Sequence, residues 1–349
     1  MFTEINQSAA LRSRLLGLLA GPHGVDRYTE LLDPMWTSDA RATVVAVRRS
    51  TPRSLTVSLQ PNRPVAGLRA GQYLTVTVEV DGRRHTRCYS PANAEGAALV
   101  ELTIASHDGG VVSEHLLRNA RPGMTVGLST PAGDFVVPEV RPRRLLLIAG
   151  GSGITPVMAI ARTLQGERYD GDVAVVHYVH ALQDAAYRDE LAAMPNVRVL
   201  YGCTRAPGGD LDGHLDQTHL AAAMADPDAV YVCGPPALVD AVRRYRPDAK
   251  AESFAPAPLV MPDSPGGGRI TFSDSGIDAV DDGRPLLNQA EDAGLTPTSG
   301  CRMGICHTCT RRKARGVVRN VSTGVISTDA DEAVQICVSV AVGDVDIAL

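Results

Sequence analysis

The sequence predicts a multidomain protein in which an antiparallel β-barrel is followed by a parallel α/β sheet and then by an α+β unit. Three observations predict this order. Apolar and polar residues alternate with a period of two in short segments between residues 42 and 129. From residue 145 onward, apolar strand patterns alternate with helical ones, which is typical of a parallel sheet. Residues 269–349 hold four cysteines whose spacing suits a metal cluster.

The composition excludes several classes of function. A chain of 349 residues is too long for one ordinary core, so two or three domains are expected. A net charge of −5, a pI near 6.0 and an aromatic content of 4% argue against a nucleic-acid partner. No apolar run approaches the roughly 20 residues that span a bilayer, and the N-terminus lacks a signal-peptide pattern. We therefore expect a cytoplasmic protein without a transmembrane segment.

Residues 1–39 are predicted to form a helical extension. Leucines give the first part of residues 8–34 an apolar side, and the Gly21-Pro22 pair interrupts this pattern before a second short turn. Packing against the domain that follows is the preferred interpretation. An interfacial membrane helix or an arm that docks a partner is the alternative.

Residues 40–141 are predicted to form the barrel, because short strands at close intervals are divided by turns such as Asp81-Gly82. The predicted strands are Thr43–Arg48, Leu55–Leu59, Tyr73–Val80, Val100–Ala105 and Thr125–Ser129. The segment Arg87-Cys88-Tyr89-Ser90 is expected just after a strand. It offers a cation for a pyrophosphate, a ring for stacking and a hydroxyl for hydrogen bonding.

A glycine-rich turn lies further along the same region. Gly109-Gly110-Val111-Val112-Ser113 precedes a predicted helix that begins at Glu114, with Ser113 as its N-cap. Backbone amides at such a helix start bind anions, which makes this segment a candidate anion site. A plain turn is the alternative.

Residues 142–254 are predicted to form the parallel sheet. The strand Leu145–Ala149 runs into Gly150-Gly151-Ser152-Gly153, and a helix is expected from Pro156. Further strands are predicted at Val173–Val179, Val197–Cys203 and Val230–Cys233, and further helices at Ala185–Met194 and Ala237–Tyr245. Ligands of such sheets bind at the carboxyl ends of the strands.

Three segments at these strand ends are candidate nucleotide contacts. Gly150–Thr155 joins a strand to a helix but matches neither the P-loop nor the G-x-G-x-x-G pattern, so a structural turn is the alternative. Cys233-Gly234-Pro235 closes a later strand, although Cys233 could be a buried small hydrophobe. Arg205, in the pair Thr204-Arg205, could bind a 2′-phosphate, which favours NADPH over NADH. A surface salt bridge is the alternative for Arg205.

Residues 255–268 hold four prolines and three glycines and are predicted to be a linker. In residues 269–349, the spacing C-x4-C-x2-C is followed by a lone cysteine, as in a plant-type [2Fe–2S] site. The four candidate metal ligands are Cys301, Cys306, Cys309 and Cys337. Structural zinc, a redox C-x-x-C pair and a Rieske centre using His307 are alternatives that fit the spacing less well.

Four segments, Arg87–Ser90, Gly110–Ser113, Gly150–Pro156 and Cys233–Pro235, occur in the order and spacing of the plant-type ferredoxin–NADP reductase superfamily. With the C-terminal cysteines, the chain resembles three-domain oxygenase reductases, which consist of an FAD-binding barrel, an NAD(P)-binding domain and a β-grasp ferredoxin domain. The segment Gly21–Tyr28 further resembles actinobacterial electron-transfer partners of stearoyl-CoA desaturases.

The resemblance implies roles for individual residues. Arg87 would bind the FAD pyrophosphate, Tyr89 would stack on the isoalloxazine and Ser90 would lie near flavin N5. The flavin site would also include Ile104, Gly110, Val111 and Ser113. The dinucleotide would be held by Gly151, Ser152, Gly153, Thr155, Thr204, Arg205, Cys233, Gly234 and Pro235. Glu252 and Phe254 would lie beside the flavin, and the catalytic group would comprise Tyr89, Ser90, Cys233, Glu252 and Phe254. The segment Ser106-His107-Asp108 departs from the basic residue that many relatives carry there.

Together these features predict an enzyme that passes electrons from NADPH or NADH through FAD and a [2Fe–2S] cluster to an oxygenase. A membrane fatty-acyl desaturase is the preferred acceptor, with any membrane contact made through that partner. Basic residues that directly follow the cysteine loop (residues 301–309) are predicted to dock an acidic partner, and solvated surface charge is the alternative. These residues are Arg311, Arg312, Lys313, Arg315 and Arg319. The alternative functions are a reductase for a soluble hydroxylase or dioxygenase, and a redox-sensing Fe–S flavoprotein.

Overall fold

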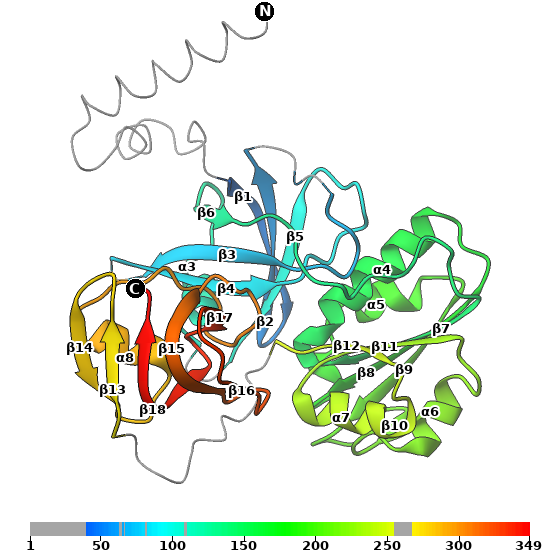
Figure 1. Ribbon diagram of the computed structural model, residues 1–349. Coiled ribbons are helices and arrows are strands. Elements are labelled where there is room, and N and C mark those ends of the chain that lie inside the picture. The colour runs from blue at the N-terminus through cyan, green and yellow to red at the C-terminus, as the bar shows by residue number, and fades with distance from the viewer. Residues whose placement is uncertain (1–39, 63–64, 66, 81, 108–109, 255–266) are drawn as a thin grey trace, which may run out of the picture.

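The computed structural model in Figure 1 describes residues 40–254, except 63–64, 66, 81 and 108–109, and residues 267–349. The extension expected at residues 1–39, most of the linker expected at 255–268, and Asp81 and Gly109 lie outside the described residues. The described chain contains three sheets, each formed by a separate stretch of sequence. In this part of the chain, no helix is long and apolar enough to cross a membrane.

The first sheet is antiparallel and has the order β4-β3-β6-β1-β2-β5. Its strands are β1 (Arg41–Thr51), β2 (Ser54–Pro61), β3 (Leu74–Val80), β4 (Arg83–Tyr89), β5 (Val100–Ala105) and β6 (Thr125–Leu128). Alternate residues such as Val44, Leu59 and Leu102 fill one core, because successive side chains of a strand point to opposite faces. Helix α3 (Val111–Asn119) closes this core with Val112 and Leu116.

Two expectations for this unit were wrong. Strand β4 was not predicted, and Arg87, Cys88 and Tyr89 lie within it rather than after a strand. Helix α3 begins at Val111 with Gly110 as its N-cap residue. The Ser113 hydroxyl donates to the Gly110 carbonyl at 3.1 Å, so Ser113 belongs to the first turn and is not the N-cap.

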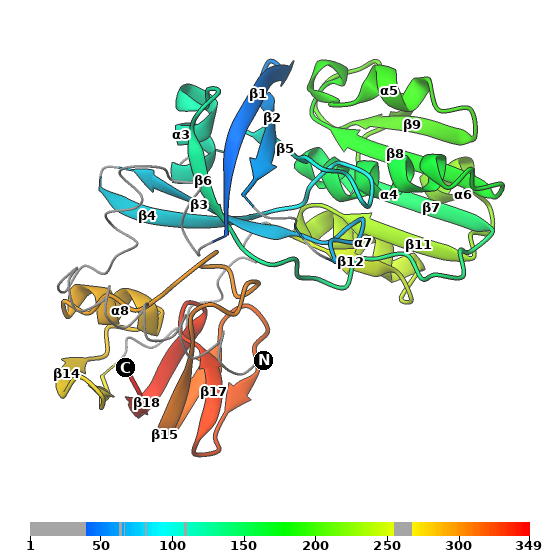
Figure 2. The same cartoon turned by 90° about the horizontal axis from the view of Figure 1, so that it is seen from above.

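The second sheet is parallel and has the order β10-β9-β8-β7-β11-β12. Its strands are β7 (Arg144–Gly150), β8 (Asp172–Val179), β9 (Val197–Cys203), β10 (Leu211–Asp212), β11 (Ala229–Cys233) and β12 (Lys250–Glu252). Helices α4 (Ile154–Gly166) and α5 (Arg188–Ala192) cover one face, and α6 (Gln217–Ala223) and α7 (Pro236–Tyr245) cover the other (Figure 2). Both faces are buried, which explains the continuous apolar run of β7.

The helices of this unit differ from expectation at their starts. Helix α4 begins at Ile154, after a 3₁₀ turn over Gly151–Gly153. The helix expected at Ala185–Met194 is the shorter α5, which Tyr187 precedes in the left-handed conformation with φ of 62°. Another 3₁₀ turn, Leu182–Asp184, lies just before the range expected to be helical.

The third sheet is mixed, with the order β14-β13-β18-β15-β16 and with β17 paired to β15. Its strands are β13 (Arg269–Phe272), β14 (Ile277–Val280), β15 (Thr310–Asn320), β16 (Ile326–Ser327), β17 (Glu332–Gln335) and β18 (Ser339–Ile347). Strands β13 and β18 are parallel, whereas the other pairs are antiparallel. Helix α8 (Leu286–Asp292) packs Leu286, Leu287 and Ala290 onto this sheet.

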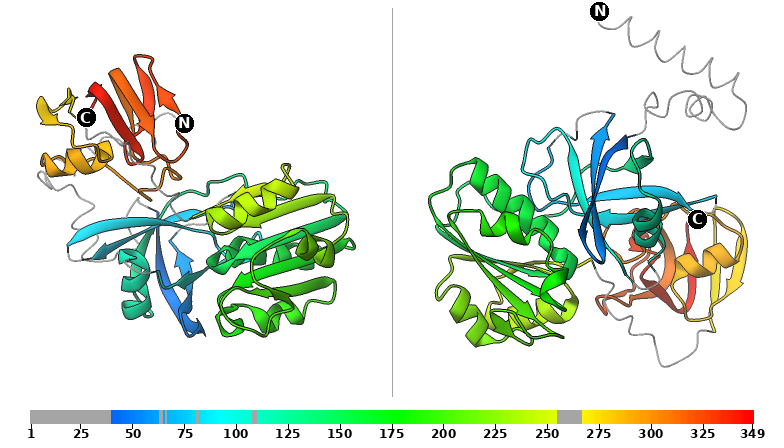
Figure 3. Two further views of the ribbon diagram at one scale, coloured as in Figure 1. Left: turned by 90° about the horizontal axis from the view of Figure 1, so that it is seen from below. Right: turned by 180° about the vertical axis from the view of Figure 1, so that it is seen from behind.

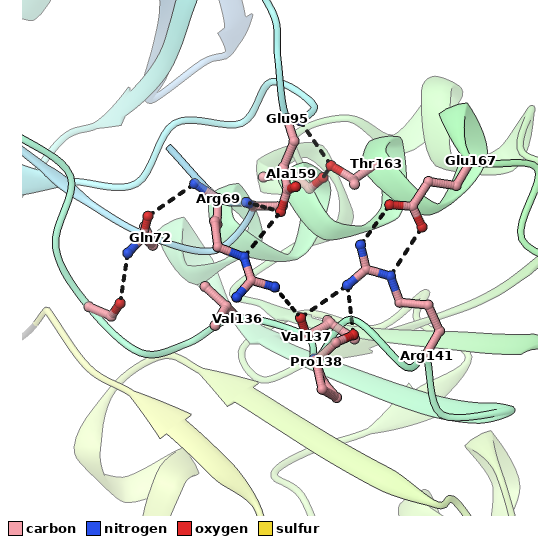
Figure 4. Close-up of polar contacts among 12 residues, drawn as sticks. Arg69, Gln72, Glu95, Val136, Val137, Pro138, Arg141, Ala159, Thr163 and Glu167 are labelled. Atoms are coloured by element: carbon pink, nitrogen blue, oxygen red, sulfur yellow. Dashed lines mark hydrogen bonds and ion pairs between the residues drawn. The ribbon is translucent and has the colours of Figure 1, made fainter. Parts of the chain in front are cut away.

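We call the parts of the chain built on the first, second and third sheets the antiparallel unit, the parallel unit and the third unit. The antiparallel unit lies between the other two in the views of Figures 2 and 3. Polar contacts join it to the parallel unit, as Figure 4 shows. The Glu95 amide donates to the Thr163 hydroxyl of α4 at 3.1 Å, while the Glu95 carboxylate accepts from the Ala70 amide at 2.8 Å. Arg69 also donates to the Val137 carbonyl at 2.8 Å, which holds the segment that connects β6 to β7.

Candidate functional site

Strand β4 places three of the predicted flavin contacts at the edge of the antiparallel sheet. Tyr89 packs against the core of this unit, and burial raises the pKa of its hydroxyl. Ser90 follows directly and is 3% exposed, and its Oγ has no hydrogen-bond partner among the described residues. Arg87 donates to the carbonyl of Thr86 at 2.8 Å. A buried hydroxyl without a partner is costly, so Ser90 fits a position that meets a polar edge of a ligand.

The start of α3 and strand β5 supply the other predicted flavin residues. Gly110 and Val111 lie at the N-terminus of α3, where free backbone amides favour an anion. A Cβ on Gly110 would lie 2.3 Å from Ser113 Oγ and 3.0 Å from the His107 carbonyl oxygen, so a side chain here would force Ser113 to move. Ile104 has no exposed surface and belongs to the core of the antiparallel unit. Ile104 can therefore act only by shaping that core.

The predicted nucleotide loop packs directly on the predicted Cys233–Pro235 turn. A Cβ on Gly153 would lie 2.0 Å from the Cys233 carbonyl oxygen, and one on Gly150 would lie 2.7 Å from the Pro235 ring. These contacts bring together two segments that are about eighty residues apart in sequence. The Thr155 hydroxyl donates to the Ser152 carbonyl at 3.2 Å and closes the loop.

His177 of β8 contacts this loop, and no sequence pattern predicted its role. Its ring is completely buried on β8, and Nε2 lies 3.0 Å from the carbonyl oxygen of Gly151. Burial lowers the pKa of His177 to about 4, so the ring is neutral at pH 7. A neutral ring can donate from Nε2 to that carbonyl, which fixes the position of Gly151.

Arg205 lies two strands away from the glycine loop, at the end of β9. The amides of Thr204 and Arg205 donate to the carbonyls of Val179 and His180 at 2.9 and 3.0 Å. The Arg205 side chain is exposed, and it makes no ion pair with any described residue. A free guanidinium at this sheet edge can bind a phosphate.

Glu252 and Cys233 lie side by side at the ends of β12 and β11. Burial raises the pKa of the Glu252 carboxyl to about 8, with a further contribution from Asp134, and its Oε2 has no partner among the described residues. The Cys233 thiol is completely buried, and burial also raises its pKa. A neutral carboxylic acid can hold and release a proton near neutral pH.

Two aromatic rings connect this carboxyl with the third unit. Tyr73 and Phe254 meet edge to face, with ring centroids 5.8 Å apart. The Tyr73 hydroxyl donates to the Ile305 carbonyl of the cysteine loop at 3.1 Å. Tyr73 was not predicted as a site residue, because its role depends on a contact with a segment far along the chain.

The four C-terminal cysteines form two pairs. The backbone amides of Met303, Ile305 and Cys306 donate to Cys301 Sγ at 3.3–3.4 Å. Cys306 Sγ accepts from the Cys301 amide at 3.1 Å and from the Thr308 hydroxyl at 3.2 Å. These donors stabilise thiolates, and hydrogen bonds from the Cys301 and Cys88 side chains lower the pKa of Cys306.

Cys309 and Cys337 form the second pair. A hydrogen bond from Cys337 lowers the pKa of Cys309 to about 7. Both side chains are buried, at 2% and 6% exposure. In the described part of the chain, no group of three or more His, Cys, Asp or Glu residues is arranged around a single metal ion. A binuclear cluster instead takes two thiolates at each iron, and two adjacent pairs match that requirement.

The loop conformation also suits thiolate ligands. A Cβ on Gly300 would lie 2.4 Å from Cys306 Sγ, so the backbone must approach this sulfur without a side chain. His307, the residue that a Rieske centre would use, has its Nδ1 3.1 Å from the Gln335 amide nitrogen. This contact occupies the His307 ring on the exposed side of the loop.

The predicted basic patch is smaller than expected. Lys313 is completely buried on β15, where its Nζ donates to the carbonyls of Gly316 and Asp329. Arg312 forms an ion pair with Asp331 at 2.5 Å. Lys313 therefore contributes to the core of the third unit and cannot contact a partner.

The first two units match known families. Residues 45–137 match the oxidoreductase FAD-binding domain, and residues 147–244 match the oxidoreductase NAD-binding domain. An NADPH oxidoreductase of Mycobacterium tuberculosis is 33% identical over 338 residues, which cover 91% of this chain and 87% of that protein. This chain belongs to the FAD- and NAD-binding oxidoreductases of the ferredoxin reductase-like superfamily. The oxidoreductase depends on NAD(P)H, as its two matched domains and this relative indicate.

Further relatives extend over the third unit of the oxidoreductase. The reductase subunit of stachydrine N-demethylase from Rhizobium meliloti is 27% identical, over 85% of this chain and 92% of that protein. Phthalate dioxygenase reductase, described as a modular structure for electron transfer from pyridine nucleotides to [2Fe–2S], has a TM-score of 0.66 at 22% identity. The match covers 89% of this chain and 98% of that chain, and it concerns the fold.

Proposed function

We propose that this oxidoreductase passes electrons from NADPH through FAD and a [2Fe–2S] cluster to an oxygenase. The observation that carries the proposal is the meeting of all three units at one place. Tyr73 of the antiparallel unit, Phe254 after the parallel sheet, and Cys301 of the cysteine loop belong to one apolar cluster. A flavin beside Tyr89 and Ser90 and a cluster on the cysteine loop would therefore be close neighbours.

The residues present fit both groups. Bound there, FAD would supply conversion of an electron pair to single electrons, and the cluster would supply one-electron transfer. Ser90 would meet the flavin through its free hydroxyl, and the start of α3 would hold phosphates. The pair Cys301 and Cys306 would bind one iron, and the pair Cys309 and Cys337 would bind the other.

Glu252 and the two rings have separate roles in this proposal. With a pKa of about 8, Glu252 is mostly protonated at pH 7 and can exchange a proton at Oε2 with a reacting group. Tyr73 and Phe254 exclude water between Glu252 and the cysteine loop. The Cys233 thiol stays neutral beside Glu252, and because it is completely buried it would support the nicotinamide site from the core beneath it.

Metal and flavin content tests this proposal directly. Anaerobically purified protein is expected to contain one FAD, two irons and two sulfides per chain. Cys337→Ser should lose iron and sulfide while keeping FAD, because its effect is confined to the third unit. Cys203→Ser, at a buried cysteine of the parallel unit, is the matched control and should keep all three. Zinc in place of iron, or a chain without flavin, would contradict the proposal.

The preference for NADPH is proposed from Arg205. Replacing Arg205 by alanine should raise the KM for NADPH by about tenfold and leave the KM for NADH unchanged, since a charged hydrogen bond to a phosphate is worth roughly 1.5–3 kcal/mol. Arg198 is exposed on the same strand and provides the control, Arg198→Ala. An equal rise for both nucleotides would show that Arg205 does not read the 2′-phosphate.

A fatty-acyl desaturase is the acceptor we prefer, on the resemblance of residues 21–28. A reductase of a soluble oxygenase is the second candidate, and the names of relatives such as the 1,2-phenylacetyl-CoA epoxidase subunit of Escherichia coli favour it. Electron transfer to a purified membrane desaturase and to a soluble oxygenase distinguishes the two. A redox sensor is the third candidate. It would bind the cofactors but transfer electrons to neither acceptor.

A further inference from the structure

Cys88 and Cys203 have no role in the cofactor sites described above, and of the two only Cys88 lies beside the cysteine loop. Cys88 lies on β4 between Arg87 and Tyr89 and is paired with Thr75 of β3. Its side chain is 7% exposed and points away from the core that Tyr89 joins. The alternation of side chains along a strand explains this direction, because neighbouring residues face opposite sides.

On that side, Cys88 packs against the cysteine loop of the third unit. It belongs to the apolar cluster formed with Tyr73, Cys301 and Cys306. Cys301 and Cys306 pack against Cys88 in this cluster, so the Cys88 thiol lies next to the loop that carries these two sulfur atoms. A methyl or methylene group would fill the same space, so packing alone does not require a thiol.

The direction of hydrogen bonding follows from the partners. A thiolate that binds iron can only accept, whereas a neutral thiol can donate through its S–H. The other donors to Cys301 and Cys306 in the described residues all belong to residues 301–308 of the same loop. Cys88 of the antiparallel unit would therefore be a donor to these sulfurs from outside the loop.

Hydrogen bonds to the sulfurs of an iron–sulfur cluster stabilise its reduced, more negative form and raise its reduction potential. We propose that Cys88 is a positioning residue that donates its S–H to the thiolates of Cys301 and Cys306 and raises the potential of the cluster while the two units are in contact. This inference rests on the proposed function, because it requires the cluster. It makes the cluster a better electron acceptor where it faces the flavin.

A redox titration followed by electron paramagnetic resonance tests the inference on the full chain. Cys88→Ala should shift the reduction equilibrium of the cluster about tenfold toward the oxidised form, which is 59 mV for a one-electron couple. Cys88→Ser keeps a hydrogen-bond donor of similar shape, so the reduction potential of its cluster should lie close to that of the wild-type protein. Cys203→Ala, a buried cysteine on β9, removes a thiol far from the cluster and should change nothing.

A second measurement does not depend on the reduction potential. Electron–nuclear double resonance spectra of the reduced cluster, compared between H₂O and D₂O, should show one more exchangeable proton in the wild-type protein than in Cys88→Ala. An unchanged potential in Cys88→Ala, or a Cys88→Ser protein that behaves like Cys88→Ala, would overturn the inference. Absence of any cluster signal in wild-type protein would instead remove the proposed function, so the two failures are distinguishable.

Discussion

Arg162 joins the antiparallel and parallel units, and its replacement by methionine tests how strongly that junction holds them together. Arg162 lies on α4 and is 17% exposed. It donates to Glu101 Oε1 of β5 and to the Ala92 carbonyl, each at 2.8 Å. It also forms two hydrogen bonds to the Glu190 carboxylate of α5, at 2.6 and 2.7 Å.

The expected loss of stability depends on how deeply the carboxylates that pair with Arg162 are buried. Breaking a fully buried pair costs about 3–5 kcal/mol, but the Glu101 side chain is 24% exposed, so we expect about half of that. The Glu190 side chain is 41% exposed and should add less than about 1 kcal/mol. Arg162→Met also leaves the Ala92 carbonyl without its donor. The three losses together should lower the free energy of unfolding by about 3 kcal/mol.

Urea unfolding followed by far-ultraviolet circular dichroism measures this loss. A double-mutant cycle with Glu101→Gln should give a coupling free energy of about 1–2 kcal/mol, because the two side chains touch. Arg118→Met removes an exposed ion pair with Glu114 and should cost less than about 1 kcal/mol. Additivity of Arg162→Met and Glu101→Gln within about 0.5 kcal/mol would refute the reasoning.

Three further predictions concern single positions. Gly153→Ala should abolish NAD(P)H binding while FAD stays bound, because its Cβ would lie 2.0 Å from the Cys233 carbonyl oxygen; Gly166→Ala meets no atom within 4 Å and should bind normally. Glu252→Gln should flatten the pH dependence of stability, measured as urea midpoints from pH 5 to 8. With a folded pKa of about 8 against 4.5 unfolded, the folded wild-type chain keeps a proton that the unfolded chain releases. Its stability should therefore fall as pH rises through this window, by at most about 1.4 kcal/mol per unit. Lys313→Met should lower the free energy of unfolding of the third unit by about 2 kcal/mol, because the carbonyls of Gly316 and Asp329 lose a charged donor. Arg312→Met, at an exposed ion pair, should leave this free energy nearly unchanged.

Local patterns were sufficient to predict most strands of the antiparallel and parallel sheets. The apolar run of β7 followed by glycines specified a buried strand and a tight turn, and both are present. Strand β4 was missed because its sequence, RRHTRCY, is mostly polar, and its place depends on pairing with β3. The burial of Lys313 was also missed, because a charged residue in a basic run is normally exposed.

The contacts between units could not be predicted from local sequence. Tyr73 and Cys88 come from the antiparallel unit and Ile305 from the third unit, and no spacing rule relates them. His177 carries no motif, and its role appears only when β8 is placed beside the glycine loop. Long-range packing determines these positions, so a single sequence without homologues does not reveal them.

Anaerobic stopped-flow mixing with NADPH or NADH, while flavin and cluster absorbance are followed, tests the central claim most directly. The account predicts fast flavin bleaching, then cluster reduction in the same chain, with NADPH clearly preferred. Equal rates with NADH would contradict the role given to Arg205. A flavin that stays oxidised with both nucleotides, or a reduced flavin beside a cluster that never changes, would contradict the proposed electron path.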